Sequence, residues 1–191
     1  MSSHFYAMLS RMKNIYRWGL MRNTRKENLS EHSLEVAFIA HALAVIRNRR
    51  FGGNLNAEKI ACAAMFHDTS EIITGDMPTP IKYFNEDIKG AFKQIEALAD
   101  DKLIAMLPED LREDFYPLYN PSDEEKKIIK AADKLSALIK CIEENAMGNR
   151  EFLDAEKATR KALQNFDIPE VKVFLEEFIP SFSLTLDEQK I

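Results

Sequence analysis

The sequence predicts an all-α protein, and three observations support that prediction. Apolar residues recur at helical spacing along most of the 191 residues, whereas the alternating pattern typical of strands is nearly absent. Only six glycines and seven prolines interrupt the chain, so long helices joined by short loops are expected. Hydrophobic residues make up 46% of the composition, enough for a proper core, and the length suggests one domain spanning residues 1–191.

The first long helix is expected from about residue 29 to residue 50. Asn28 and Glu31 have the spacing of a capping box, and the sequence FGGN at 51–54 supplies glycine where a helix end needs positive φ. The apolar residues of this helix predict one core stripe and four residues that widen it: Leu34, Phe38, Ala42 and Val45, then Val36, Ile39, Leu43 and Ile46.

A second helix is expected from about Asn56 to Ile73, closed by Gly75. A rigid loop, DMPTP, should follow, because two prolines two residues apart cannot continue a helix. The rest of the chain predicts helices over residues 84–107, within 108–119, within 121–146, over 151–166 and over 169–178. Ser122 and Glu125 form another capping box at the start of the third of these.

Charge is unevenly distributed along the chain. The net charge of −5 disfavours general binding to nucleic-acid polymers. Residues 1–26 nevertheless hold no acidic residue and six basic ones: Arg11, Lys13, Arg17, Arg22, Arg25 and Lys26. This positive lobe indicates a local seat for an anion such as phosphate, and a mitochondrial presequence is the alternative.

No apolar run is expected to reach the ~18–20 residues that a membrane span needs, and no cleavable signal is recognised. Cys62 and Cys141 both lie within apolar helical pattern, which is typical of reduced, buried thiols. The sequence therefore predicts a cytoplasmic protein without a membrane partner.

Four ionisable side chains fall where a core is expected. His67 and Asp68 end an apolar run, His32 lies in the first turns of the first long helix, and Asp133 borders the apolar stripe of a later helix. An unpaired carboxylate moved toward a core costs several kcal/mol, and a bound cation removes that cost. Two imidazoles and two carboxylates suit one divalent ion, although each residue taken singly reads as capped, salt-bridged or solvent-facing.

Other polar residues near these four are assigned by their spacing. His41 follows His32 by nine residues and so points to the opposite side of the helix, which predicts an ordinary packed or surface histidine. Glu71, one turn after His67, and Asp76, on the loop behind Gly75, are candidates for handling a proton. The alternatives are an exposed salt bridge for Glu71 and a turn or capping residue for Asp76.

The spacing of His32, His67-Asp68 and Asp133 in an all-helical chain resembles that of the HD-domain metal-dependent phosphohydrolases. The segments IYRWGLMRNTRKENLSEHSLEVA, FHDTSEIITGDMPTPIKYF and AADKLSALIKCIEE are similar to the YfbR-type 5'-deoxynucleotidases, over essentially the entire chain. The resemblance implies an HD-domain helical bundle that removes the phosphate from 2'-deoxyribonucleoside 5'-monophosphates and selects against ribonucleotides. It also implies a homodimer, and no residue set predicts a base preference.

The resemblance implies roles for individual residues. The Arg17 fork would orient the phosphate, and Trp18 would form a wall against C2' of the sugar that leaves no room for a hydroxyl. Without the resemblance, Trp18 reads as a core anchor and the loop after Gly75 as a turn. The expected metal ligands are His32, His67, Asp68 and Asp133; the expected catalytic residues are Glu71 and Asp76, with their proton roles unassigned; and the expected substrate-binding residues are Arg17, Trp18, Asp68, Asp76, Met77, Pro78, Thr79 and Asp133.

One divalent ion per chain is the expected cofactor. Mixed nitrogen and oxygen ligands suit Mn, Co, Fe, Ni or Zn, and Mg less well, while the resemblance favours cobalt or manganese. Two alternatives stay open: an HD-type hydrolase of another phosphate, such as a cyclic nucleotide or a guanosine alarmone, and a non-catalytic helical nucleotide-binding protein. The presence of all four ligand positions together with Glu71 argues against the second.

Overall fold

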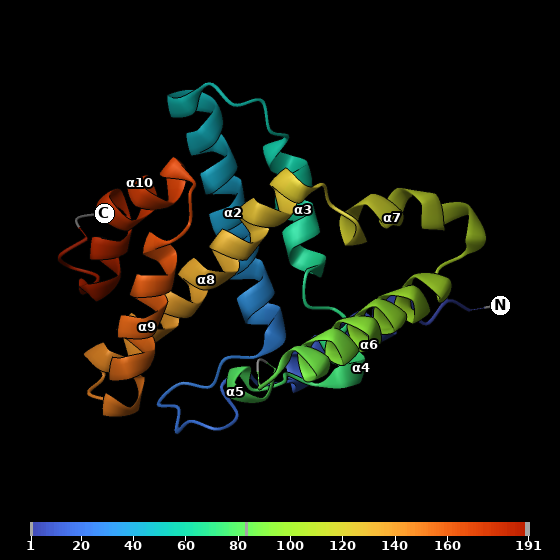
Figure 1. The fold of residues 1–191 in the computed structure, drawn as a ribbon, viewed down its shortest axis with the longest axis horizontal. Helices are drawn as coiled ribbons and strands as arrows, with labels where there is room; N and C mark the ends of the chain where they lie inside the picture. Colours follow the sequence, from blue (N-terminus) through green and yellow to red (C-terminus); the bar gives the residue numbers. More distant parts are fainter. Residues whose placement is uncertain (1, 83, 190–191) are drawn as a thin grey trace.

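The protein is described by a computed structural model over residues 2–82 and 84–189, and this part of the chain is a bundle of helices without a strand (Figure 1). Its one β-bridge in that range joins Tyr16 and Asn28. The prediction of an all-α fold is therefore confirmed. The helices, in chain order, are α1 (Phe5–Leu9), α2 (Leu29–Phe51), α3 (Ala57–Phe66), α4 (Glu71–Thr74), α5 (Thr79–Lys82), α6 (Glu86–Ala105), α7 (Arg112–Tyr119), α8 (Asp123–Ala146), α9 (Leu153–Gln164) and α10 (Pro169–Glu177), with short 3₁₀ turns at Ser10–Asn14, Glu109–Leu111, Arg150–Phe152 and Ile179–Ser183.

Both expected capping boxes form and set the starts of the two longest helices. The Asn28 side chain accepts from the backbone of Glu31 at the start of α2, and Glu31 answers by accepting from the backbone of Asn28. Ser122 and Glu125 do the same for α8. Gly52 ends α2 in the left-handed region, at φ 67°, as the glycine pair predicts.

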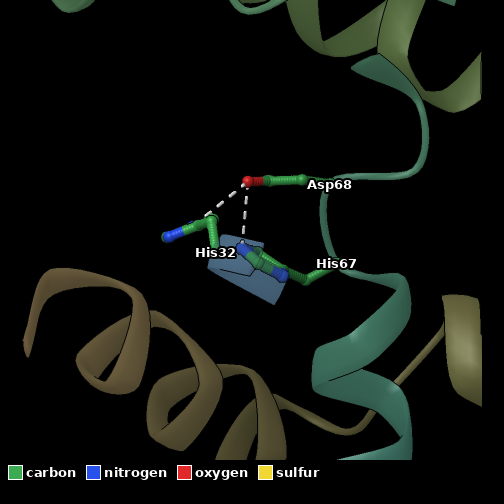
Figure 2. A group of neighbouring side chains, drawn as sticks. All are labelled: His32, His67 and Asp68. Carbon is green, nitrogen blue, oxygen red and sulfur yellow. Dashed lines mark ion pairs between the residues drawn. The ribbon is translucent and has the colours of Figure 1, made fainter. Parts of the chain in front are cut away.

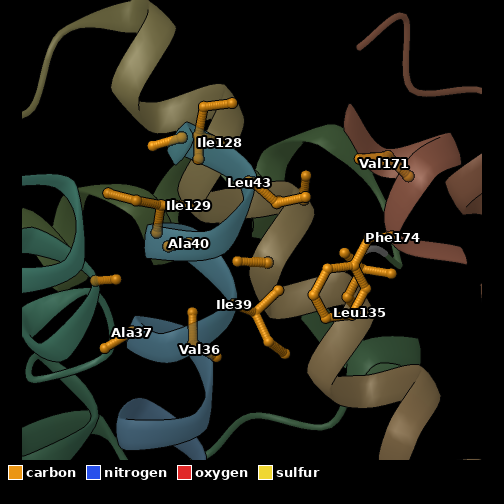
Figure 3. Close-up of a cluster of buried hydrophobic side chains, with 14 of the residues drawn as sticks. Val36, Ala37, Ile39, Ala40, Leu43, Ile128, Ile129, Leu135, Val171 and Phe174 are labelled. Atoms are coloured by element: carbon orange, nitrogen blue, oxygen red, sulfur yellow. The ribbon is translucent and has the colours of Figure 1, made fainter. Parts of the chain in front are cut away.

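The larger core lies where α2 crosses α3, α8 and α10. Figure 3 shows Leu43 of α2, Leu135 of α8 and Phe174 of α10 converging in it. Leu43 and Leu135 have no exposed surface, and Phe174 is 5% exposed. Burying a side chain of this size contributes roughly 1.5–3 kcal/mol. These contacts fix α2 against α8, the two helices that carry His32 and Asp133.

The predicted core stripe of α2 is partly wrong. Leu34 is 50% exposed, Phe38 is 68% exposed and Val45 is 38% exposed, whereas the residues expected to widen the stripe form the buried face. The physical reason is that α2 carries apolar residues on most of its surface. Its neighbours in space, rather than its own periodicity, decide which face is covered.

A smaller apolar cluster joins α1, α6 and α7. Phe5 and Leu103 are fully buried in it, and the rings of Phe5 and Phe115 meet edge to face at 5.3 Å. Phe66, the last residue of α3, packs against this cluster, while Ala63 and Ala64 belong to the larger one. The end of α3 therefore lies where the two clusters meet.

The expected continuous helix from Asn56 to Ile73 is interrupted. α3 ends at Phe66, residues 67–70 form turns, and α4 begins at Glu71. The carbonyl of Phe66 accepts from both the backbone N–H and the hydroxyl of Thr69, at 3.2 and 2.9 Å, which favours a tight turn over a further helical turn. This break lifts His67 and Asp68 out of the helix.

The predicted loop after Gly75 is shorter than DMPTP. Gly75 ends α4 at φ 75°, and α5 already begins at Thr79, with Pro80 in its first turn. Proline is tolerated there because the first turn of a helix needs no backbone donor. The non-helical part of the loop is thus residues 76–78.

By length and composition alone, α2 could cross a membrane, which the sequence pattern did not lead us to expect. However, 56% of its apolar window is buried inside the protein, against α3, α8 and α10. The apolar character of α2 is accounted for by its central place in the core.

Candidate active site

His32, His67 and Asp68 gather at the point where α3 ends against α2. Their ligand atoms all lie within 4.8 Å of one another, a group that could hold a metal ion. In Figure 2 the Asp68 carboxylate points toward both imidazole rings. One oxygen of Asp68, Oδ2, lies 3.1 Å from Nε2 of His67 and 3.6 Å from Nε2 of His32. The turn after Phe66 makes this approach possible, because adjacent residues on a regular helix diverge by about 100°.

Asp133 reaches the same point from α8. Its Oδ1 lies 3.2 Å from Nε2 of His32 and 3.9 Å from Nη2 of Arg17. Ala131 and Ala132, which precede it, are fully buried against the core. The four residues predicted as ligands from their spacing therefore converge, although they are contributed by three separate segments.

The two imidazole rings are oriented by their other nitrogens. Nδ1 of His67 donates to the carbonyl of Ala64 at 2.7 Å, and Nδ1 of His32 lies 3.1 Å from the hydroxyl of Ser136. Nε2 of each ring is buried and lacks a hydrogen-bond partner among the described residues. Two orphaned ring nitrogens facing two carboxylates fit a divalent cation better than they fit any hydrogen bond on offer.

Charges within the cluster shift its pKa values strongly. Burial alone would lower the pKa of His67, but the carboxylate of Asp68 outweighs burial and raises it to about 9. Burial, reinforced by the charge of Arg17, lowers the pKa of His32. Burial would raise the pKa values of the carboxylates, yet the histidines hold that of Asp133 at about 2 and that of Asp68 well below its usual range.

These shifts predict that cation binding releases a proton. His67 is protonated at neutral pH and must become neutral to offer Nε2, whereas His32 is already neutral. The affinity for Co²⁺ should therefore rise with pH by up to about tenfold per unit between pH 6 and 9, with about one proton released per ion near pH 7. Calorimetry in two buffers of different ionisation enthalpy measures both quantities. His41→Gln, a change at an exposed histidine, should leave them unaltered, and a pH-independent affinity would contradict the assignment.

Arg17 and Trp18 lie beside this cluster and share one carboxylate that the sequence pattern did not single out, that of Glu27. Oε2 of Glu27 accepts from Nε of Arg17 at 3.3 Å and from Nε1 of Trp18 at 3.0 Å. Nη1 of Arg17 also donates to Asp68, at 3.4 Å. A signal was present: Glu27 is the first acidic residue after a stretch of 26 residues without one.

The loop that carries Trp18 is fixed at both its base and its tip. At the base, the backbone N–H of Arg17 donates to the carbonyl of Glu27 at 3.0 Å. At the tip, the buried carboxylate of Glu144 on α8 accepts from the backbone N–H groups of Thr24 and Arg25, at 2.9 and 3.1 Å. Trp18 itself has a φ of 60°, a left-handed conformation that costs a non-glycine residue on the order of 1–3 kcal/mol. Such strain persists only where the surroundings hold it.

Glu71 is buried beside the cluster at the start of α4. Its side chain has one oxygen, Oε2, without a hydrogen-bond partner in the described structure. Burial, followed by the charges of Asp68 and Asp76, raises the pKa of Glu71 to about 9. Asp76 is half-buried; burial raises its pKa, and the charge of Arg17, followed by the backbone N–H of Trp18, opposes that rise. The two carboxyl groups thus sit on opposite ends of α4, both within the electrostatic reach of Asp68.

The remaining predicted residues follow Asp76 along the chain. Met77 and Pro78 are half-buried, and Thr79 is exposed as the first residue of α5. Their contact with a nucleoside stays a prediction. His41, expected to be ordinary, is exposed on α2.

An all-α bundle that brings His32, His67-Asp68 and Asp133 together belongs to the HD-domain class of proteins. A solved HD-domain phosphohydrolase from Listeria innocua superposes with a TM-score of 0.82 at 25% identity, covering 98% of this chain and 92% of that one. An HD phosphohydrolase of cyanophage S-2L, solved with dA and one catalytic Zn²⁺, superposes with a TM-score of 0.63 at 19% identity, covering 92% and 96%, and so supports the fold alone.

The sequence family described as 5'-deoxynucleotidase YfbR-like matches residues 4–182. A 5'-deoxynucleotidase of Yersinia pestis is 57% identical over 189 residues, covering 97% of this chain and 96% of that protein. A 5'-deoxynucleotidase of Yersinia pseudotuberculosis matches to the same extent. The chain belongs to the YfbR-like 5'-deoxynucleotidase family.

Proposed function

We propose that this protein is a metal-dependent 5'-deoxynucleotidase, which converts a 2'-deoxyribonucleoside 5'-monophosphate and water to the deoxynucleoside and phosphate. The observation that carries the proposal is that carboxylate oxygens of Asp68 and Asp133 lie 3.6 and 3.2 Å from Nε2 of His32. The near-full-length relatives named 5'-deoxynucleotidase support both the reaction and a deoxynucleotide as the substrate class. We propose little base preference.

His32, His67, Asp68 and Asp133 would hold one divalent ion per chain, with cobalt or manganese as the first candidates and magnesium or zinc as alternatives. The two imidazoles in this group favour a transition metal over magnesium. Such an ion lowers the pKa of bound water and neutralises phosphate charge. The residues around it then need only to orient the monoester and to move protons.

The remaining site residues divide this work. Glu71, buried and without a partner for one oxygen among the described residues, would orient the attacking water or take a proton from it, and Asp76 would assist in proton handling and in placing the ligand. The guanidinium of Arg17 would bind the phosphate oxygens, and Trp18 would exclude a 2'-hydroxyl. Asp68 and Asp133 would also face the substrate, and residues 77–79 would line the nucleoside.

We further propose that residues 1–191 form a single HD domain that acts in the cytoplasm as a homodimer. The two apolar clusters meet at the end of α3, directly before His67 and Asp68. The site therefore depends on both clusters, which supports one domain. Analytical ultracentrifugation measures the oligomeric state.

Phosphate release across a panel of nucleotides tests the proposed function. The panel contains the four deoxynucleoside 5'-monophosphates, the matching ribonucleotides, deoxynucleoside 3'-monophosphates and a cyclic nucleotide, each with Co²⁺, Mn²⁺, Mg²⁺ or Zn²⁺ added to chelator-treated protein. All four deoxy 5'-substrates should be hydrolysed, and the ribonucleotides at least about tenfold more slowly by kcat/KM. Preferred hydrolysis of the cyclic nucleotide would favour the alternative substrate class. Full activity after chelation would refute the metal mechanism.

A further inference from the structure

Behind His32, on the side away from Asp68, a chain of hydrogen bonds runs through two side chains that the proposed mechanism does not use. Nδ1 of His32 lies 3.1 Å from Oγ of Ser136, and that hydroxyl donates to Oε2 of Glu35 at 2.5 Å. His32 and Glu35 lie one turn apart on α2, and Ser136 faces them from α8. Ser136 is fully buried and His32 is 1% exposed.

The direction of these hydrogen bonds is set by the number of protons available. The Ser136 hydroxyl has a single proton, which it donates to Glu35 in a hydrogen bond. The same oxygen can therefore only accept a hydrogen bond from His32. Nδ1 of His32 therefore carries the ring proton. Nε2 is left with a free lone pair, buried and without a hydrogen-bond partner, 3.2 Å from Asp133.

We propose that Glu35 and Ser136 are positioning residues, which hold His32 in the Nδ1–H form and aim its Nε2 at the cation. The proposal rests on the proposed metal site. A carboxylate that orients a ligand histidine through a hydroxyl raises the basicity of the ring as well as fixing its orientation. The predicted consequence is that both residues set metal affinity without touching the ion or the substrate.

His67 provides the internal reference for the experiment, because its Nδ1 bonds to the backbone and not to a side chain. His67 donates its Nδ1 proton to a backbone carbonyl, that of Ala64, at 2.7 Å. No side-chain substitution removes that acceptor. The ring of His32 is therefore the one whose tautomer depends on replaceable side chains, and His67 serves as an internal reference in the same spectrum.

A cavity of about 190 Å³ lies beside Glu35. Most of the residues that line it are charged, and Glu35 and Glu143 are among them. Burial raises the pKa of Glu35 to about 7, and the opposing effect of the hydrogen bond from Ser136 is smaller. Measurements at pH 8 thus keep the carboxylate charged. Glu143 is a matched control, because it lines the same cavity but accepts no hydrogen bond from Ser136.

Long-range ¹⁵N–¹H correlation spectra of chelator-treated protein at pH 8 test the tautomer directly. The wild-type spectrum should show a proton on Nδ1 of both His32 and His67 and none on Nε2 of His32, with each ring assigned from single histidine substitutions. Ser136→Ala should shift His32 toward a mixture of tautomers and leave His67 unchanged. Ser33→Ala removes a buried hydroxyl without a hydrogen-bond partner one residue from His32, so its spectrum should match the wild type.

Titration with Co²⁺ alone, followed by calorimetry, tests the consequence. Ser136→Ala and Glu35→Gln should weaken binding by about 10- to 100-fold, whereas Ser33→Ala and Glu143→Gln should change it less than about threefold. Glu35→Asp, which keeps the charge, should restore part of the loss. An Nδ1–H ring in Ser136→Ala, or a Co²⁺ affinity equal to that of Ser33→Ala, overturns the proposal. Failure of the wild type to bind Co²⁺ would instead refute the metal site. The spectra of chelator-treated protein would still test whether Ser136 and Glu35 set the tautomer of His32.

Discussion

Replacing Glu71 by glutamine is expected to lower kcat by about 10²- to 10³-fold while leaving metal affinity nearly unchanged. Glu71 is buried, one of its oxygens has no hydrogen-bond partner in the described structure, and its pKa is raised to about 9 by burial and by the charges of Asp68 and Asp76. This carboxyl forms no salt bridge in the described structure, and the charge of a cation held by Asp68 would lower its pKa toward neutral, where it can accept a proton from water. Glutamine fills the same space but cannot take a proton.

Steady-state kinetics with a deoxynucleoside 5'-monophosphate, paired with Co²⁺ calorimetry, measures this effect. Glu113→Gln, at an exposed residue of α7, is the matched control and should retain wild-type kcat. Asp76→Asn, measured alongside, assigns the proton roles: a smaller loss than that of Glu71→Gln identifies Glu71 as the principal base. A kcat within threefold of wild type for Glu71→Gln would refute its catalytic role.

Removing the indole of Trp18 is expected to relax the choice of sugar. The preference for deoxyribonucleotides over ribonucleotides, expressed as a ratio of kcat/KM values, should fall at least about tenfold. The ring is held on two sides, by the Nε1 hydrogen bond to Glu27 and by Phe152, whose ring centre lies 5.3 Å away. A wall fixed in this way cannot move aside for an added hydroxyl, and its loss opens that space.

Two substitutions separate the loss of the ring from a shift of the loop. Alanine at position 18 must adopt the φ of 60°, which strains it, whereas Trp18→Gly accepts that conformation freely. Agreement between the two variants assigns the effect to the indole. Tyr16→Ala, at an exposed aromatic residue two positions earlier, should keep wild-type selectivity. Unchanged selectivity in Trp18→Gly would contradict the steric argument.

Much of the fold follows from local signals. The starts of α2 and α8 are fixed by capping boxes and the end of α2 by Gly52, and all three are readable in the sequence. The break after Phe66 is not readable, because no glycine or proline marks it and the turn depends on Thr69 bonding back to a carbonyl. The exposure of Leu34 and Phe38 is likewise decided by the neighbours of α2.

Part of the candidate site was likewise predictable from the sequence, and part was not. The spacing of ionisable residues in apolar helices was sufficient to predict that His32 and Asp133 meet, and the structure places them 3.2 Å apart. Glu27, Glu35 and Ser136 were missed, since each matters through what it touches across the packing of α2, α8 and the loop before α2. The spacing of residues along a chain does not predict such contacts between separate elements.

The ion pairs of Arg17 have a consequence for how the protein is made. Arg17 and protonated His67 contribute two positive charges to the pocket, against the three carboxylates of Glu27, Asp68 and Asp133. The polypeptide itself therefore compensates most of the carboxylate charge of the pocket. We therefore expect the chain to fold without the ion and to bind it afterwards, unlike small domains that cannot adopt their structure until a metal is bound.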